Sequence, residues 1–217
     1  MKQTITIALF CLGIASAQTE PQKVEDENVR ASLGSAAPGH KGPMHRHALN
    51  RVLIHLDAGH QRQVLEDGKV RDNLFKPGDI RWDPAGGMHT SENVGAIPYR
   101  VAEIEVKKPG GAPAQFSDLD PAKVDPKHYR VELENSQVRV TRVRFGPHER
   151  GPMHEHLLPR LTVTLTEQAV RLTLPDGSVR EVRNAAGLMS LGVPAKHSEE
   201  NLSDSPFEAV MVEFKGR

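Results

Sequence analysis

Two nearly identical hexapeptides contain the residues best suited to chemistry: GPMHRH at positions 42–47 and GPMHEH at positions 151–156. In a β-strand, residues i and i+2 point to the same side, so each His-x-His pair would present two imidazoles to one cavity. Three neutral imidazoles leave coordination positions free for a substrate, an arrangement that suits iron, manganese, nickel, copper or zinc. With one later histidine in each copy, the predicted metal ligands are His45, His47 and His89 in the first set and His154, His156 and His197 in the second.

These histidines belong to an internal repeat of the chain. Gly42 falls on Gly151, an offset of 109 residues (151 − 42 = 109), and the same offset places Arg51 on Arg160. After one deletion in the second copy, His89 falls on His197. A single His-x-His pair is more often structural than ligating, but two complete sets in one frame favour ligation. The pattern indicates a duplicated unit rather than a solenoid, which needs three or more repeats.

Short alternating runs, such as RVLIHL at 51–56 and RVAEIEVK at 100–107, predict the strands that position these side chains. The Asp67-Gly68 pair between two such runs predicts a hairpin. No long stretch shows a helical apolar period, so we expect few helices. Proline and glycine are frequent in residues 108–127, which favours a linker between the two copies.

The first 17 residues have the pattern of a cleaved signal peptide. A basic start at Lys2 precedes an apolar stretch that ends in Ala15-Ser16-Ala17, and the stretch is too short to span a bilayer. The alternative is a buried N-terminal helix. We expect a periplasmic or secreted protein that begins at Gln18, with a flexible lead-in over residues 18–28 and no membrane anchor after cleavage.

Composition excludes several classes of function. Cys11 is the only cysteine and would leave with the signal peptide, so the mature chain would have no disulfide, thiolate ligand or cysteine nucleophile. Lysine plus arginine total 28 and aspartate plus glutamate total 28, without a basic stripe. This balance argues against a nucleic-acid partner and against electrostatic docking on membranes. A small-molecule ligand is the expected partner.

Both halves resemble the cupin superfamily in the histidine motifs and in the glycines and prolines around them, so the whole chain resembles a bicupin. The matching segments include Gly39 to His47 and Gly78 to Asn93 in the first half, and HEH at 154–156 with HSEEN at 197–201 in the second. The resemblance implies an all-β fold of two tandem antiparallel jelly-roll barrels, each with six to eight strands and a metal pocket. The implied domains are residues 29–107 and 130–217, joined by a linker over 108–129. Barrel edges of this kind often pair between subunits, which is compatible with a homodimer.

One departure from the cupin pattern affects both halves. Cupin metal sites usually add a glutamate four or five residues after the His-x-His pair, where this chain has Arg51 and Val52, or Arg160 and Leu161. Each metal would therefore be held by three histidines only. An inward-facing arginine about 6 Å from a divalent cation would be repelled by about 5 kcal/mol at an effective dielectric of about 20.

Three outcomes would relieve that repulsion. The arginine swings away, a nearby acid such as Glu92 or Glu200 neutralises it, or an anionic ligand bridges metal and arginine. A salt bridge at the rim and capture of a substrate carboxylate thus both stay open for Arg51 and Arg160. His55 continues the inward register and is a candidate hydrogen-bond donor behind the metal ligands or a proton carrier. His40, His60, His128 and His148 are expected to be exposed loop residues.

The leading functional hypothesis is a metal-dependent oxygenase that acts on a small compound, with a carboxylate as one candidate class. The alternative is a non-catalytic bicupin that binds a small molecule or a metal, and the missing glutamate favours it. Sugar isomerisation without a redox metal is disfavoured, because aromatics are only 4% of the chain. Oxalate-decarboxylating bicupins use the glutamate that this chain lacks, so that activity is disfavoured too.

Overall fold

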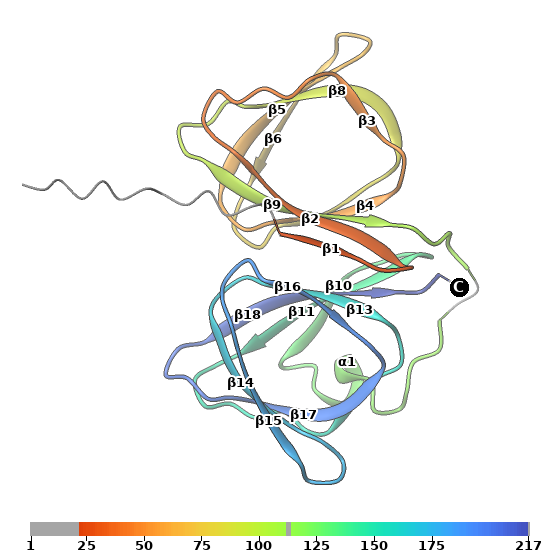
Figure 1. Cartoon of the computed structure of the whole chain (residues 1–217), viewed down its shortest axis with the longest axis vertical. Coiled ribbons are helices and arrows are strands. Elements are labelled where there is room, and N and C mark those ends of the chain that lie inside the picture. Colours follow the sequence, from red (N-terminus) through yellow and green to blue (C-terminus); the bar gives the residue numbers. More distant parts are fainter. Residues whose placement is uncertain (1–21, 112–113, 217) are drawn as a thin grey trace, which may run out of the picture.

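The computed structural model describes residues 22–111 and 114–216, and it consists almost entirely of antiparallel strands (Figure 1). Within these ranges the only helix is α1 (Pro121–Val124), and no helix is both long and apolar enough for a membrane span. The all-β prediction is confirmed. The predicted signal peptide lies outside the described residues, so its cleavage stays a prediction.

The N-terminal half forms a barrel from a five-stranded sheet, in the order β1-β2-β9-β4-β7, and a four-stranded sheet, in the order β3-β8-β5-β6. The strands are β1 (Lys23–Glu25), β2 (Val29–Ala36), β3 (His45–His47), β4 (Arg51–His55), β5 (Gly59–Leu65), β6 (Val70–Phe75), β7 (Ile80–Asp83), β8 (Gly86–Asn93) and β9 (Tyr99–Val106). These nine strands exceed the expected six to eight, partly because β1 adds itself to the edge of the larger sheet.

The C-terminal half repeats this order strand for strand, as a duplication requires. Its sheets run β10-β11-β18-β13-β16 and β12-β17-β14-β15. The strands are β10 (Tyr129–Glu134), β11 (Val138–Phe145), β12 (His154–His156), β13 (Arg160–Thr164), β14 (Gln168–Thr173), β15 (Val179–Asn184), β16 (Met189–Gly192), β17 (Ala195–Asn201) and β18 (Phe207–Phe214).

Each four-stranded sheet contains a hairpin at one edge, and the two hairpins are equivalent in the repeat. Strands β5 and β6 pair across the turn at Asp67-Gly68, and β14 pairs with β15 across Asp176-Gly177. Gly68 has φ 81° and Gly177 has φ 82°, a left-handed conformation that glycine adopts without steric cost. The hairpin predicted at Asp67-Gly68 is therefore confirmed.

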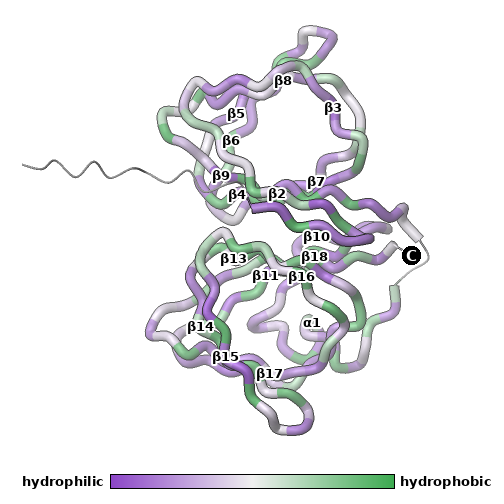
Figure 2. The backbone as a smooth tube through the Cα atoms, viewed as in Figure 1, coloured by the Kyte–Doolittle hydropathy of each residue, from purple (hydrophilic) through white to green (hydrophobic). Residues whose placement is uncertain are grey.

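The two barrels share one apolar core, which lies between their five-stranded sheets. Val52 and Ile54 of β4 join Leu161 and Val163 of β13 in this cluster, and all four are fully buried. Figure 1 shows the two larger sheets facing each other, and Figure 2 shows hydrophobic and hydrophilic residues interspersed along their strands. Because strand neighbours alternate in direction, the other residues of β4 point into the N-terminal barrel.

Two segments expected to lack regular structure are ordered where the structure describes them. Residues 18–28 were expected to be flexible, but within the described part, residues 22–28, β1 pairs with β2 and Gln22 donates a hydrogen bond to the carbonyl of Met189 at 2.9 Å. The predicted linker contains α1, whose first turn is capped by the side chain of Asp120. Asp120 is only 2% exposed and binds Arg139, so this segment is part of the C-terminal barrel.

Candidate metal centres

The first predicted triad comes together at the junction of β3 and β8, where His45 pairs directly across from His89. Nε2 of His45 lies 3.1 Å from Nε2 of His47. On the far side of the rings, Nδ1 of His45 lies 2.9 Å from the carbonyl of Pro43, and Nδ1 of His89 lies 3.3 Å from that of Gly87. These carbonyls accept the Nδ1 protons and leave the Nε2 lone pairs facing one another.

The second triad has the same construction on β12 and β17 but is more deeply buried. His154 pairs across from His197, and its Nδ1 donates to the carbonyl of Pro152 at 3.1 Å. The exposed fractions are 0% for His154, 3% for His156 and 8% for His197.

Both donor sets fit a divalent transition metal. In each triad one ligand atom per histidine lies within 4.8 Å of the others. Two nitrogens that each lie about 2.1 Å from a shared ion are separated by about 3.0–3.4 Å, and the 3.1 Å between His45 and His47 falls in that range. Burial lowers the pKa of His89 and His154, lowers that of His156 to about 2 and lowers that of His197 to about 3. Imidazoles that are neutral at pH 7 bind a metal without first losing a proton.

Each triad also has a carboxylate behind it that the sequence pattern did not reveal: half-buried Glu105 in the first barrel and buried Glu213 in the second. Oε1 of Glu105 lies 3.9 Å from Nδ1 of His47, and Oε1 of Glu213 lies 3.6 Å from Nδ1 of His156. The other carboxylate oxygen of each glutamate accepts a bond of 2.6 Å, from Arg30 or Arg139. The glutamates face Nδ1 rather than Nε2, so each candidate site remains a set of three histidines. The two glutamates occupy equivalent positions in the two repeats, and this equivalence was the signal in the sequence that could have identified them.

Arg51 faces the first triad, as strand alternation predicts, and two acids neutralise it. Its Nε and Nη2 donate to Oδ2 of Asp83 at 2.8 and 2.7 Å, and its Nη1 donates to Glu103 at 2.8 Å. Nη1 also lies 2.5 Å from Nε2 of His47. The suggestion that Glu92 neutralises Arg51 was wrong, because Glu92 lies on β8 and approaches Lys41. Asp83 reaches Arg51 because β7 pairs with β4.

Arg160 occupies the equivalent place in the second barrel without equivalent acids. Gly192 stands where the first barrel has Asp83, and Met211 stands where it has Glu103. Nη1 of Arg160 donates to the carbonyl of Val193 at 2.6 Å, and no described carboxylate lies within 4.0 Å of its guanidinium. The suggested partner Glu200 instead approaches Arg171 at 3.3 Å. Burial lowers the pKa of Arg160.

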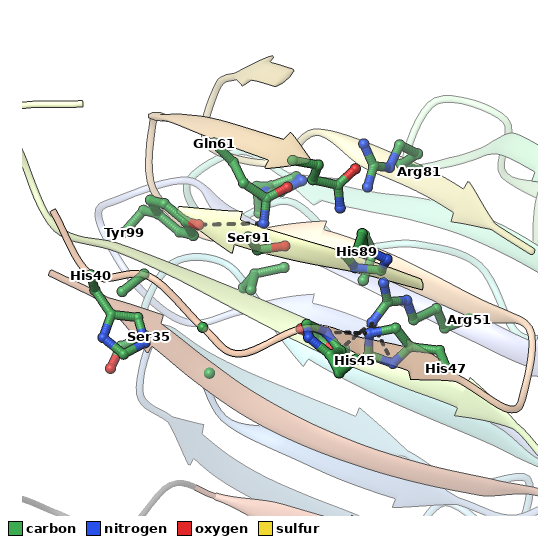
Figure 3. Close-up of a pocket in the computed structure, with 18 residues that line it drawn as sticks. Ser35, His40, His45, His47, Arg51, Gln61, Arg81, His89, Ser91 and Tyr99 are labelled. Atoms are coloured by element: carbon green, nitrogen blue, oxygen red, sulfur yellow. Dashed lines mark hydrogen bonds and ion pairs between the residues drawn. The ribbon is translucent and has the colours of Figure 1, made fainter. Parts of the chain in front are cut away.

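A polar cavity of about 190 Å³ adjoins the first triad inside the N-terminal barrel. In Figure 3 the triad and Arg51 lie at one end of the view, and Gln61 and Tyr99 lie at the other. Gly34 and Ala36 of β2 line the same cavity and contribute almost no side-chain volume. A second hollow, of about 400 Å³, borders His47 from the side of β1 and β2. The first triad is thus accessible to a small molecule.

Apolar side chains fill the equivalent interior of the C-terminal barrel. Val143 and Phe145 replace Gly34 and Ala36, as the pairing of β11 with β18 and of β2 with β9 shows. Phe145 is 1% exposed and stacks on Phe207 with ring centroids 5.2 Å apart. The rest of this cluster consists of Tyr129, Val170, Ala209 and Met211, with Leu172 and Val182 packed against it.

Comparison with solved structures identifies the architecture. AerE from Microcystis aeruginosa is 12% identical, with a TM-score of 0.61 over 89% of this chain and 96% of that one. A variant of Bacillus subtilis oxalate decarboxylase is 13% identical, with a TM-score of 0.63 over 92% of this chain and 76% of that one. A variant of salicylate 1,2-dioxygenase from Pseudoaminobacter salicylatoxidans is 13% identical, with a TM-score of 0.58 over 86% and 71%. The last two are cupin-family proteins. This chain has the bicupin fold. No family model matches its sequence, and no curated protein does.

The second triad has two further polar neighbours that sequence reasoning missed. The hydroxyl of Tyr129 lies 3.4 Å from Nε2 of His154 and donates to Oε2 of Glu199 at 2.6 Å. Burial raises the pKa of both Tyr129 and Glu199. The HSEEN motif contains Glu199, but only the folded barrel brings Tyr129 to it.

Two of the four histidines expected on exposed loops are placed otherwise in the structure. His128 is 6% exposed, stacks on Phe145 and lies 2.7 Å from Asp125. His60 lies within β5 and is half-buried. His40 and His148 are exposed, as expected.

His55 lines the cavity of the N-terminal barrel, and the structure shows what surrounds it. It is 7% exposed and stacks on Phe75 with ring centroids 3.7 Å apart. Burial lowers its pKa to about 4, so the imidazole is neutral at pH 7. This disfavours a proton carrier at neutral pH, because such a group works best with a pKa near the working pH. A catalytic role for His55 stays a prediction.

Proposed function

We propose that this bicupin is a metal-dependent, oxygenase-type enzyme that acts on a small carboxylate compound in the N-terminal barrel. The observation that supports it best is an accessible polar cavity at the open side of three convergent imidazoles. A catalytic metal site keeps a coordination position for substrate, whereas a structural site is closed by protein ligands.

Two acids offset the positive charge that Arg51 places beside the first triad. Arg51 contributes one positive charge, and Asp83 and Glu103 contribute two negative charges within 2.8 Å of it. The repulsion predicted for an unpaired arginine is therefore offset. In this arrangement Arg51 is a positioning residue that holds two carboxylates and contacts His47, and its part in turnover remains our proposal.

The cavity residues would bind and orient the substrate. Tyr99 and Gln61 supply a hydroxyl and an amide at the end of the cavity opposite the triad, and they lie 3.5 Å apart. A bound iron or manganese ion would supply Lewis acidity and redox chemistry toward dioxygen. Two structural neighbours support this class: a salicylate dioxygenase, and an oxalate decarboxylase described with Mn(II) centres.

A non-catalytic binding protein is the second candidate, and one contact favours it. Nη1 of Arg51 lies 2.7 Å from Nδ1 and 2.5 Å from Nε2 of His47, so the arginine occupies space beside a ligand nitrogen. A protein with this contact could use the cavity for a small molecule without turnover.

Metal content tests the proposal first. Elemental analysis of protein purified without added metal should find two ions per chain, with one lost in His45→Ala and the other in His154→Ala. His148→Ala removes an exposed histidine outside both triads and should change nothing. A wild-type protein that holds no metal under several loading conditions would contradict the metalloenzyme.

Oxygen consumption then separates the two candidates. Metal-loaded protein should consume dioxygen with at least one member of a panel of small carboxylates, and His45→Ala should not. Metal binding without oxygen consumption across the panel would favour the non-catalytic protein. Export is also part of the proposal, and mass spectrometry of the mature protein should find its N-terminus at Gln18.

A further inference from the structure

Arg81 of β7 is a second arginine in the N-terminal cavity, and its hydrogen bonding differs from that of Arg51. Arg51 uses Nε, Nη1 and Nη2 on Asp83 and Glu103. Arg81 uses Nη1 alone, which donates to Oδ1 of Asn73 at 3.0 Å. No described residue accepts a hydrogen bond from its Nε, and the carboxylate oxygen of Asp83 lies 3.7 Å from its Nη2.

The unbonded edge of Arg81 has the geometry that recognises a carboxylate. Nε and Nη2 point the same way from the guanidinium plane, and together they donate two parallel hydrogen bonds to a carboxylate. Asp83 does not fill this role for Arg81, because its nearest oxygen, Oδ1, lies 3.7 Å from Nη2, and Nε has no partner among the described residues. Burial lowers the pKa of Arg81, as expected for a positive charge without full compensation.

The register of β4 and β7 places Arg81 at a useful distance from the triad. Arg51 pairs with Asp83 and Leu53 pairs with Arg81, so Arg81 lies one pleat, about 7 Å, further along the barrel wall. His55 follows on the same inward face, and its Nδ1 is buried without a partner among the described residues. Both side chains line the cavity of about 190 Å³.

We propose that Arg81 binds the carboxylate of the ligand through Nε and Nη2, one pleat further along the barrel wall than Arg51. This replaces Arg51 as the carboxylate-binding residue and rests on the proposed function only in placing a small carboxylate in this cavity. The cavity volume of about 190 Å³ implies a compact acid whose other end faces the histidines. Ser190 stands at the equivalent position of the second barrel, so the subsite belongs to the N-terminal barrel alone.

Calorimetry with propionate and its neutral isostere propionamide tests the assignment. Wild-type protein should bind propionate and not propionamide. Arg81→Ser, which introduces the residue of the second barrel, should weaken propionate binding about tenfold or more. Arg81→Lys keeps the positive charge but loses the two parallel N–H donors. Its affinity for propionate should lie between those of the wild type and Arg81→Ser. Arg71→Ser removes an exposed arginine of β6 and should bind as the wild type does.

A further variant distinguishes Arg81 from the metal as the binding group. His45→Ala, which breaks the first triad, should retain propionate binding. Loss of binding in His45→Ala, or unchanged binding in Arg81→Ser with its melting temperature preserved, would overturn the assignment. Arg81-dependent binding in a protein that holds no metal would support this subsite while the proposed enzyme fails.

Discussion

The two barrels have the same strand order and the same histidine triad, and they differ in what lies behind the triad. In the N-terminal barrel Gly34 and Ala36 leave room for a polar cavity. In the C-terminal barrel Val143 and Phe145 occupy those positions within an apolar cluster. The duplication thus kept the ligands in both copies while the packing behind them diverged.

The comparison indicates a division of roles. An open triad with a neutralised arginine can take a substrate beside a metal. A triad with ligands at 0–8% exposure, beside Tyr129 and an apolar core, is suited to holding an ion that stabilises the fold. The apolar core shared by the two five-stranded sheets holds the barrels together, so the second barrel can stabilise the fold of the first.

Exchanging the cavity residues should remove the difference between the two barrels, and it should have the largest effect on function. Gly34→Val with Ala36→Phe gives the first barrel the side chains of the second and should abolish oxygen consumption and propionate binding. A Cβ at Gly34 would meet its nearest atom, the carbonyl oxygen of Val101, at 3.8 Å, so a side chain can start there without a backbone clash. Full activity in a folded double variant would place the reaction elsewhere.

Truncation of the aromatic side chain at one equivalent position of each barrel should show how tightly the two barrel interiors are packed. Phe207→Ala should lower the free energy of unfolding by about 3–5 kcal/mol, because it opens a void in a closed cluster. Tyr99→Ala, at the same position of the first barrel, should cost less, because Tyr99 already borders a cavity. Urea denaturation of both variants measures this, and equal losses would remove the distinction.

Removal of the acids beside Arg51 should weaken metal binding at the first site. Asp83→Asn with Glu103→Gln leaves a positive charge beside His47, and we expect about 10- to 100-fold lower affinity there. Glu92→Gln is the matched control, since Glu92 approaches Lys41 instead. Competition with a chelator measures the affinity, and an unchanged value would show that the acids do not compensate Arg51.

Acid should destabilise the metal-free protein, mainly through the second triad. The folded pKa values of His156 and His197, about 2 and about 3, lie below the unfolded value of about 6.5. The unfolded chain therefore binds more protons below pH 6.5, and the free energy of unfolding should fall as pH drops from 6.5 toward 3. His156→Gln should flatten this dependence more than His45→Gln. Equal slopes in the two variants would contradict the difference in burial.

The sequence predicted the parts of the site that are local or repeated. The spacing of the histidines within a strand sets their common direction, and the repeat offset identified both triads. The inward direction of Arg51 followed from alternation along one strand. These features depend on neighbours within one strand or on comparison of two aligned copies.

The features that the sequence did not predict depend on strand pairing across the barrel. Asp83 and Glu103 reach Arg51 only because β7 and β9 flank β4. The cavity depends on side-chain volumes from both sheets, and Tyr129 meets His154 across the second barrel. The alternation of apolar and charged residues along β9 is visible in the sequence, but the sequence alone does not give the register of β9 against β4.

Access of water to each metal site tests whether the N-terminal centre is open and the C-terminal centre is closed. With Mn(II) bound, His154→Ala retains the first site alone and His45→Ala retains the second alone. The relaxation rate of water protons reports whether solvent reaches the bound ion. We expect markedly faster relaxation for the first site than for the second, because the first triad borders a cavity and the second is buried. Equal rates, or faster relaxation for the second site, would contradict an open N-terminal centre and a closed C-terminal one.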